Sequence, residues 1–388
     1  MYRHAGRMCA LAATAALISG CAAAHSGRSQ RAALGAEGGD ASVAALLRGQ
    51  GWSTDFTRHL VDLSEFQNGG PPRDGIPPID HPRFVSEPEG DRYLSAREPV
   101  IALVVAGEAR AYPIQILVWH EIVNDEVAGE PISVTYCPLC NSAIVYSRRV
   151  GGRILSFGTT GMLRNSDLVM WDRQTQSWWQ QFEGRALVGA LAGERLVAID
   201  SQVLSWQQFK ASYPQGVVLS RETGFQRPYG TNPYVGYEPG QTPLLYSGRP
   251  DPRLPPLERV VAVFSGGAAA VVPFARLERE PVVSGRVAGQ PFVVLFSPHV
   301  LSALDARRLS SSKEVGTAGV FDPDIAGRTL RFRSVPSGFL DDQTRSIWDV
   351  TGRALSGPLR GSQLAPRRHD EQFWFALAAF IPHAALLR

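Results

Sequence analysis

Short apolar segments separated by turn residues recur along the chain after residue 98, and in 131–136 apolar and polar positions alternate. A period of two is typical of β-strands that have one buried face. The predicted strands are 99–107, 131–136, 142–150, 153–158, 167–172 and 177–182. Gly107-Glu108 and Gly151-Gly152 are typical of the turns that join neighbouring antiparallel strands. The pattern therefore predicts a chain built mainly of antiparallel hairpins.

Two longer segments have the character of helices. Residues 114–125 follow Pro113, and the fixed φ of proline suits the start of a helix. Residues 201–214 begin with a serine and end at a proline, as a capped helix does. A few helices among many hairpins place the chain in the β-rich α+β class.

The most informative feature of the organisation is an internal repeat. Five pairs of similar segments occur in the same order, and chance does not readily produce five. The pairs are 100–113 with 260–273, 127–138 with 287–298, 172–179 with 341–348, 184–193 with 352–361, and 205–214 with 373–382. We therefore predict two tandem homologous halves.

The repeat and the composition divide the chain into six parts. The predicted boundaries are a signal peptide (1–20), a flexible tether (21–50), an N-terminal lead-in (51–97), a first repeat with the candidate site (98–220), a connector rich in Tyr, Pro and Gly (221–257), and a second, degenerate repeat (258–388). The tether assignment rests on its small and polar residues.

The N-terminus indicates export. Arg3 and Arg7 precede an apolar stretch that is too short to span a bilayer and ends at Cys21, which is the layout of a signal peptide. The segment "LISGC" also resembles the lipobox of bacterial lipoproteins. That resemblance implies that Cys21 becomes an acylated N-terminus, which anchors the chain to a bacterial envelope membrane facing the periplasm or the cell surface.

Composition and charge narrow the classes of partner. The formal charge is +3 and 44% of residues are hydrophobic, so we expect a globular domain that does not bind nucleic acid. Of the four cysteines, Cys9 leaves with the signal and Cys21 is lipidated. Only Cys137 and Cys140 remain for chemistry in an oxidising compartment. No Ser-His-Asp signature, phosphate loop or HExxH motif favours a hydrolase or a kinase.

The segment "VTYCPLCNSAIVY" places Cys137 and Cys140 between two strand-like runs. Three interpretations stay open. Two thiolates two residues apart can chelate a metal from a tight turn. The pair can instead cycle between dithiol and disulfide, although the residues after Cys140 do not favour the helix that thioredoxin-like motifs open. It can also be a structural disulfide in a non-catalytic interaction module.

A metal site needs further ligands, and His120 in "WHEIVND" is the nearest candidate in sequence. We therefore predict a copper or zinc site formed by Cys137, Cys140 and His120. The second half has Ser297, Val300 and Glu280 at these three places. Because that half lacks the residues, folding alone does not demand them, and the site belongs to the first half.

A polar loop precedes the predicted strand at 167–172. The loop consists of Arg164, Asn165, Ser166 and Asp167, and the matching part of the second half lacks the Asn-Ser-Asp run. Together with Asn141, this loop can contact a substrate or support the ligands of a metal. The alternative is an Asx-type turn before a strand.

Several of these segments together resemble the bacterial Domain of Unknown Function 3179 family. They are "DGIPPIDHPRF", "WHEIVND", "VTYCPLCNSAIVY", "LRNSDLVMWDRQT" and "LSRETGF". The resemblance extends from about residue 74 to the C-terminus, and the cysteine motif is its most specific part. Family patterns often have Gly where this chain has Asn141, and Asn also tolerates a left-handed turn. The resemblance implies an exported bacterial domain and carries no activity with it.

The lipobox yields a direct test of anchoring. Cys21→Ser removes the thiol that would be acylated, so the variant should move from the membrane fraction to the soluble fraction. Cell fractionation and immunoblotting measure the distribution. A variant that stays with the membranes after a high-salt wash would contradict the lipoprotein prediction.

Overall fold

The computed structural model describes residues 39–387. The predicted signal peptide and the lipidation site Cys21 lie outside these residues. Within them, short strands dominate, and most of the paired strands run antiparallel. The predicted β-rich α+β class is therefore confirmed.

Three sheets and one small hairpin form the first half. The first sheet consists of β15 (Ser201–Ser205), β3 (Pro99–Val105), β4 (Glu108–Pro113), β16 (Val217–Leu219) and β2 (Phe84–Val85). The second consists of β14 (Ala198–Ile199), β7 (Ser142–Ser147), β6 (Glu130–Cys137) and β5 (Ile122–Val127). The third consists of β1 (Gln67–Asn68), β10 (Phe157–Arg164), β11 (Asp167–Asp172), β12 (Trp178–Gln180) and β13 (Arg185–Val188). The hairpin pairs β8 (Arg149–Val150) with β9 (Arg153–Ile154).

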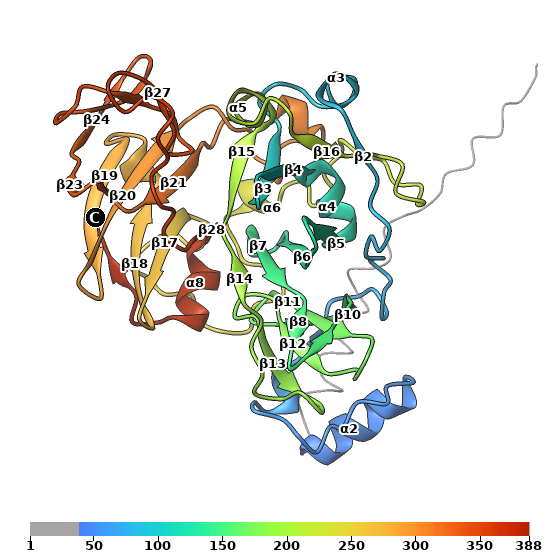
Figure 1. Ribbon diagram of the computed structural model, residues 1–388. Coiled ribbons are helices and arrows are strands. Elements are labelled where there is room, and N and C mark those ends of the chain that lie inside the picture. The colour runs from blue at the N-terminus through green and yellow to red at the C-terminus, as the bar shows by residue number, and fades with distance from the viewer. Residues whose placement is uncertain (1–38, 388) are drawn as a thin grey trace, which may run out of the picture.

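The second half has a comparable set of sheets. One contains β28 (His369–Phe373), β17 (Arg259–Ser265), β18 (Ala268–Pro273) and β29 (Ala385–Leu386). Another contains β19 (Val282–Val287), β20 (Gln290–Ser297) and β21 (Thr317–Phe321). A third contains β24 (Phe332–Val335), β25 (Gly338–Asp341), β26 (Ile347–Trp348) and β27 (Ala354–Ser356), and β22 (Asp324–Ile325) pairs with β23 (Arg328–Thr329). Figure 1 shows this half, in orange and red, beside the teal and green first half.

The two halves also use the same local hydrogen bonds. Asp172 accepts a bond from Trp179 Nε1 at 2.9 Å, and Asp341 accepts one from Trp348 Nε1 at 2.9 Å. Each half also contains one parallel pairing, β16 with β4 and β29 with β18. Both tryptophans are fully buried, as expected for core positions. These parallels favour the tandem duplication, which stays a prediction.

The helices are short. They are α2 (Asp40–Gly49), α3 (Glu87–Gly90), α4 (Ile114–His120), α5 (Trp206–Ser212), α6 (Tyr237–Gly240), α7 (Phe274–Leu277) and α8 (Trp374–Phe380), with 3₁₀ turns η1 (Leu63–Glu65) and η2 (Leu309–Ser311). None of the helices within residues 39–387 combines the length and the apolar character that crossing a membrane requires.

Both predicted long helices are half strand. The helix predicted over 114–125 ends at His120, because Glu121 adopts a left-handed φ of 59° and the chain continues as β5. The segment predicted as a helix over 201–214 begins as β15, which pairs with β3. Ser205 then caps α5 by accepting a hydrogen bond from the Gln208 N–H. In both segments, pairing with a neighbouring strand, β5 with β6 and β15 with β3, outweighed helix propensity.

The last part of the predicted flexible tether is a helix. Residues 40–49 form α2, at the end of the first half farthest from α3 in Figure 1. Val43, Ala44 and Leu47 are buried in a cluster that includes Trp178. These apolar positions share one helix face, and their burial holds the helix on the domain.

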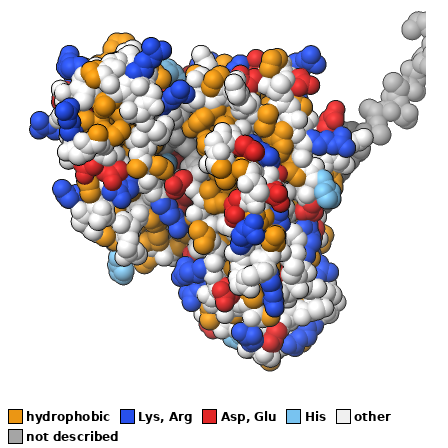
Figure 2. Space-filling view, in the orientation of Figure 1, with side chains coloured by type: hydrophobic (Ala, Val, Ile, Leu, Met, Phe, Trp, Pro, Cys, Tyr) orange, Lys and Arg blue, Asp and Glu red, His pale blue; other side chains and the backbone are white. Residues whose placement is uncertain are grey.

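The main hydrophobic core joins the two halves at the cysteine turn. Strand β28 of the second half packs on β7, and the Phe373 N–H donates to the Cys140 carbonyl at 2.9 Å. The core contains both cysteines and also Phe373 and Phe375. Outside the core, Figure 2 shows basic and acidic side chains interspersed over one face of the molecule. The cysteine turn therefore sits at the centre of the protein and not on a surface loop.

Candidate metal centre

The two cysteines lie at the ends of a tight turn between antiparallel strands. Cys137 ends β6 and faces Ser142, the first residue of β7. The Asn141 N–H donates to the Pro138 carbonyl at 3.2 Å, and Asn141 has a φ of 51°. Asn tolerates this left-handed conformation better than most residues with a side chain. The predicted tight turn is confirmed, and it brings both thiols to one place.

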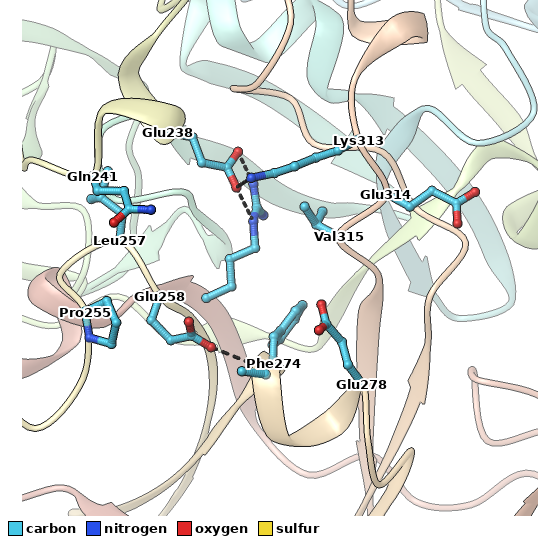
Figure 3. Close-up of a pocket in the computed structure, with 12 residues that line it drawn as sticks. Glu238, Gln241, Pro255, Leu257, Glu258, Phe274, Glu278, Lys313, Glu314 and Val315 are labelled. Atoms are coloured by element: carbon cyan, nitrogen blue, oxygen red, sulfur yellow. Dashed lines mark hydrogen bonds and ion pairs between the residues drawn. The ribbon is translucent and has the colours of Figure 1, made fainter.

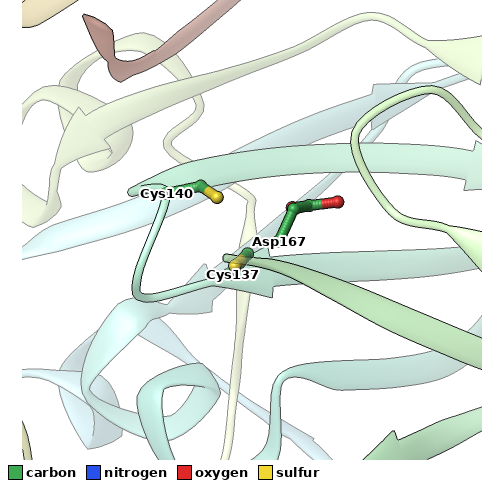
Figure 4. Close-up of side chains that lie close together, drawn as sticks. All are labelled: Cys137, Cys140 and Asp167. Atoms are coloured by element: carbon green, nitrogen blue, oxygen red, sulfur yellow. The ribbon is translucent and has the colours of Figure 1, made fainter. Parts of the chain in front are cut away.

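A second hairpin brings Asp167 to the thiols. Asn165 and Ser166 connect β10 to β11 with φ values of 53° and 67°, the pattern of a two-residue type I′ turn. Asp167 is the first residue of β11. One of its carboxylate oxygens and the two sulfurs all lie within 4.8 Å of one another (Figure 4). The three side chains thus form a group with the composition of a metal site.

The Asp167 carboxylate is anchored by one oxygen only. Its Oδ2 accepts hydrogen bonds from Gln180 Nε2 at 2.6 Å and from the Phe182 N–H at 2.9 Å. Its Oδ1 is buried and has no hydrogen-bond partner among the described residues. Buried polar atoms are normally satisfied, so this carboxylate oxygen is suited to bind a cation.

The thiols have equally sparse surroundings. Cys137 Sγ and Cys140 Sγ lie 3.8 Å and 3.6 Å from the Ser166 carbonyl oxygen. Both cysteines are free and buried. These are long contacts from weak thiol donors to one carbonyl oxygen, and the thiols otherwise interact with each other and with the Asp167 carboxylate, so the sulfurs stay available to a further group.

Burial disfavours ionisation of all three groups, the two thiols and the Asp167 carboxyl. It raises the pKa of Cys137 and of Cys140, and the negative charge of Asp167 acts in the same direction. Burial likewise raises the pKa of Asp167 to about 6, although its hydrogen bonds oppose the change. A cation placed among the three groups would reverse these shifts.

His120 does not belong to this group in the described chain. It is fully buried, and its Nδ1 lies 2.7 Å from the Pro77 carbonyl, which can only accept a hydrogen bond. Nδ1 therefore carries the proton, and Nε2 accepts from the Tyr229 hydroxyl at 2.6 Å. Both ring nitrogens are occupied, and the ring ties α4 to the lead-in and the connector. Asp167, predicted as a supporting residue, is instead the third member of the group.

The other predicted residues surround the cluster. Arg164 donates to Glu65 at 2.8 Å and to Gln180 Oε1 at 3.4 Å, so it steadies the amide that holds Asp167. Asn165 lies in the hairpin turn described above. The Asn141 Oδ1 accepts from the Tyr136 hydroxyl at 3.2 Å. A role of these residues toward a substrate stays a prediction.

Sequence reasoning missed Glu121, the neighbour of His120. Its left-handed backbone ends α4, and its side chain is 7% exposed and lines a cavity that also touches Cys137. Burial raises the pKa of Glu121 to about 8, with a smaller contribution from the charge of Asp167. The acidic residue in "WHEIVND" was the available signal, but only the unforeseen end of the helix turns it toward the cysteines.

The comparisons with known proteins agree with the resemblance seen in the sequence. Residues 73–384 match the model of a family described as "Protein of unknown function (DUF3179)". Neither the curated proteins nor the solved structures contain a significant match to the chain.

The surroundings of His120 predict a pH-dependent contribution to stability. Burial lowers its pKa in the folded chain to about 4, from 6.5. The neutral ring therefore favours the fold above pH 6.5, and this contribution is lost as the pH falls toward 4. The loss should amount to about 3 kcal/mol. His120→Gln should flatten the dependence of the unfolding free energy on pH between 6.5 and 4, measured by urea denaturation of metal-free protein.

The same variant separates a structural histidine from a ligand. His299→Gln is the matched control, because the His299 side chain is 68% exposed. Both variants should keep the metal affinity of the parent at pH 7. A large loss of affinity in His120→Gln alone would return His120 to the ligand set.

Proposed function

The chain belongs to the DUF3179 family, and within that frame we propose that it is an exported, lipid-anchored protein that binds a transition-metal ion, copper or zinc. The ligands are Cys137, Cys140 and Asp167. One observation carries the proposal: two free thiols and a carboxylate lie within 4.8 Å of one another in the core, and Asp167 Oδ1 has no partner among the described residues.

The donor atoms suit these metals. Zinc binds cysteine sulfur at about 2.3 Å and carboxylate oxygen at about 2.0–2.2 Å, so atoms separated by less than 4.8 Å need little movement to share one ion. Thiolates favour soft and borderline ions such as Cu(I) and zinc over magnesium or calcium. Which ion is bound depends also on supply in the envelope.

The electrostatics of the cluster support a bound cation. Without one, Cys137, Cys140 and Asp167 are three acids crowded into an apolar core, where ionisation is costly. A divalent ion would stabilise the two thiolates and the carboxylate, and binding would release the protons that they hold. The ion thus supplies the charge that the surrounding side chains do not.

The surroundings support a dithiol–disulfide cycle less well. Redox-active thiols have a lowered pKa and often sit at a helix N-terminus. Here Cys140 precedes strand β7, and burial raises the pKa of both thiols. In an oxidising compartment, metal binding also offers a reason for the pair to remain reduced.

The number of ligands favours a working site over a purely structural one. Structural zinc sites use four protein ligands, whereas functional sites keep a position for water or substrate. Three protein ligands are present in this cluster, and Cys137 also lines the cavity that contains Glu121. A fourth position toward that cavity would admit a small molecule.

Metal stoichiometry tests the proposal. The mature chain, loaded with zinc and freed of excess by gel filtration, should hold about one ion per chain by mass spectrometry. Replacing Cys137 and Cys140 together by Ser should reduce this to near zero. Asp167→Asn keeps an oxygen for Gln180 and Phe182 but loses a charged ligand, so affinity should fall at least tenfold.

The matched control is Asp324→Asn, which alters an exposed carboxylate in the second half. It should bind zinc as the parent does, and circular dichroism should show all variants folded. Unchanged stoichiometry in the folded double-serine variant would contradict the proposal.

A further inference from the structure

A cavity of about 260 Å³ lies against the cysteine turn. Its walls come from the lead-in, from the sheets that carry the cysteine cluster, and from the connector, and they are predominantly apolar. The lining includes Glu121, Cys137, Gly161, Leu163, Tyr234 and Leu245. An apolar cavity of about 150 Å³ can stay dry and admit benzene, so this one has room for a somewhat larger molecule.

One polar group stands out in this lining. The Glu121 side chain is 93% buried, and its carboxyl makes no hydrogen bond or ion pair with any described residue. A buried carboxyl without a partner is destabilising, and native proteins rarely retain one without a use. Its position in the cavity wall points to a partner that enters the cavity.

The walls are held in conformations that cost free energy. Leu245 has a φ of 53°, which is unusual for a bulky residue, and Ser166 Oγ donates to the neighbouring Leu244 carbonyl at 2.6 Å. Strain at a bulky residue such as Leu245 is typical of ligand-binding sites. Gly161 adopts its φ of 76° without strain, but a Cβ there would lie 2.0 Å from the Pro71 carbonyl oxygen, so only glycine fits.

A second cavity provides a contrast. It has a volume of about 340 Å³ and lies where the connector meets the second half (Figure 3). There Glu238 pairs with Arg259 at 3.1 Å and with Lys313 at 3.4 Å, and Glu258 accepts from the Ala275 N–H at 3.0 Å. The buried acid of this cavity thus has partners within the protein, which Glu121 lacks.

We propose that the cavity beside Cys137 binds a small, uncharged, largely apolar molecule that presents one oxygen acceptor to the Glu121 carboxyl. The apolar walls select an uncharged body. The Glu121 carboxyl lies in a largely apolar wall, which disfavours its charged form, and the neutral carboxyl donates a hydrogen bond to an acceptor in the cavity.

Two probes of the same shape test it. Acetophenone carries a carbonyl where α-methylstyrene carries a methylene group, so only acetophenone can accept a hydrogen bond. Binding to the mature chain at pH 6.5 can be measured by ligand-observed NMR titration. Acetophenone should bind about five- to tenfold more tightly, as expected for one hydrogen bond.

Variants assign the preference to Glu121. Glu121→Leu should bring the ratio of the two dissociation constants to about one, whereas Glu121→Gln, which still donates, should keep it above three. Leu163→Trp should block both probes by filling the cavity. Metal stoichiometry should stay unchanged in Leu163→Trp, which separates a failure of this inference from a failure of the metal proposal.

Three outcomes would overturn the inference. The first is that neither probe binds the parent protein at millimolar concentration. The second is that folded Glu121→Leu keeps the preference for acetophenone. The third is that phenethylamine, which carries a positive charge, binds more tightly than acetophenone.

Discussion

The burial of two thiols and a carboxylate in one core, with no basic side chain among the described residues to offset their charge, is the constraint on which this structure depends. Two tight turns, one at Asn141 and one at Asn165-Ser166, bring Cys137 and Cys140 close to Asp167. Each turn needs left-handed residues, and both occur in the first half. The strands around them are otherwise ordinary hairpins, so the arrangement of the three acids explains local features that folding alone does not require.

The second half contributes support to this centre. The Phe373 N–H bonds to the Cys140 carbonyl at 2.9 Å, and the connector residue Tyr237 donates its hydroxyl to the Leu139 carbonyl at 2.6 Å. The backbone of the cysteine turn is therefore clamped from outside its own sheet, which pre-organises the ligands. This explains how a half with Ser297 in the matching position remains important to a site that it does not form.

Much of the fold was predictable from sequence because short apolar runs bounded by turn residues indicate strands. The cysteine turn and the family were also predictable, because both can be recognised from short local motifs. The third member of the cysteine cluster, Asp167, was not predictable from the sequence. His120 and Asp167 lie 17 and 30 residues from Cys137, and only the tertiary pairing of two hairpins decides between them. A single left-handed residue at Glu121 then ends α4, directing His120 to Pro77 and Glu121 to the cavity.

The atoms that surround an ion loaded into the protein decide whether Cys137 and Cys140 form a metal site. X-ray absorption at the zinc or copper edge of the intact mature chain reports the atoms around the metal and their distances. We expect two sulfur neighbours of the metal, at about 2.3 Å if the ion is zinc, together with at least one oxygen neighbour. A first shell of nitrogen and oxygen without sulfur would contradict it, because no ion so surrounded could be held by Cys137 and Cys140.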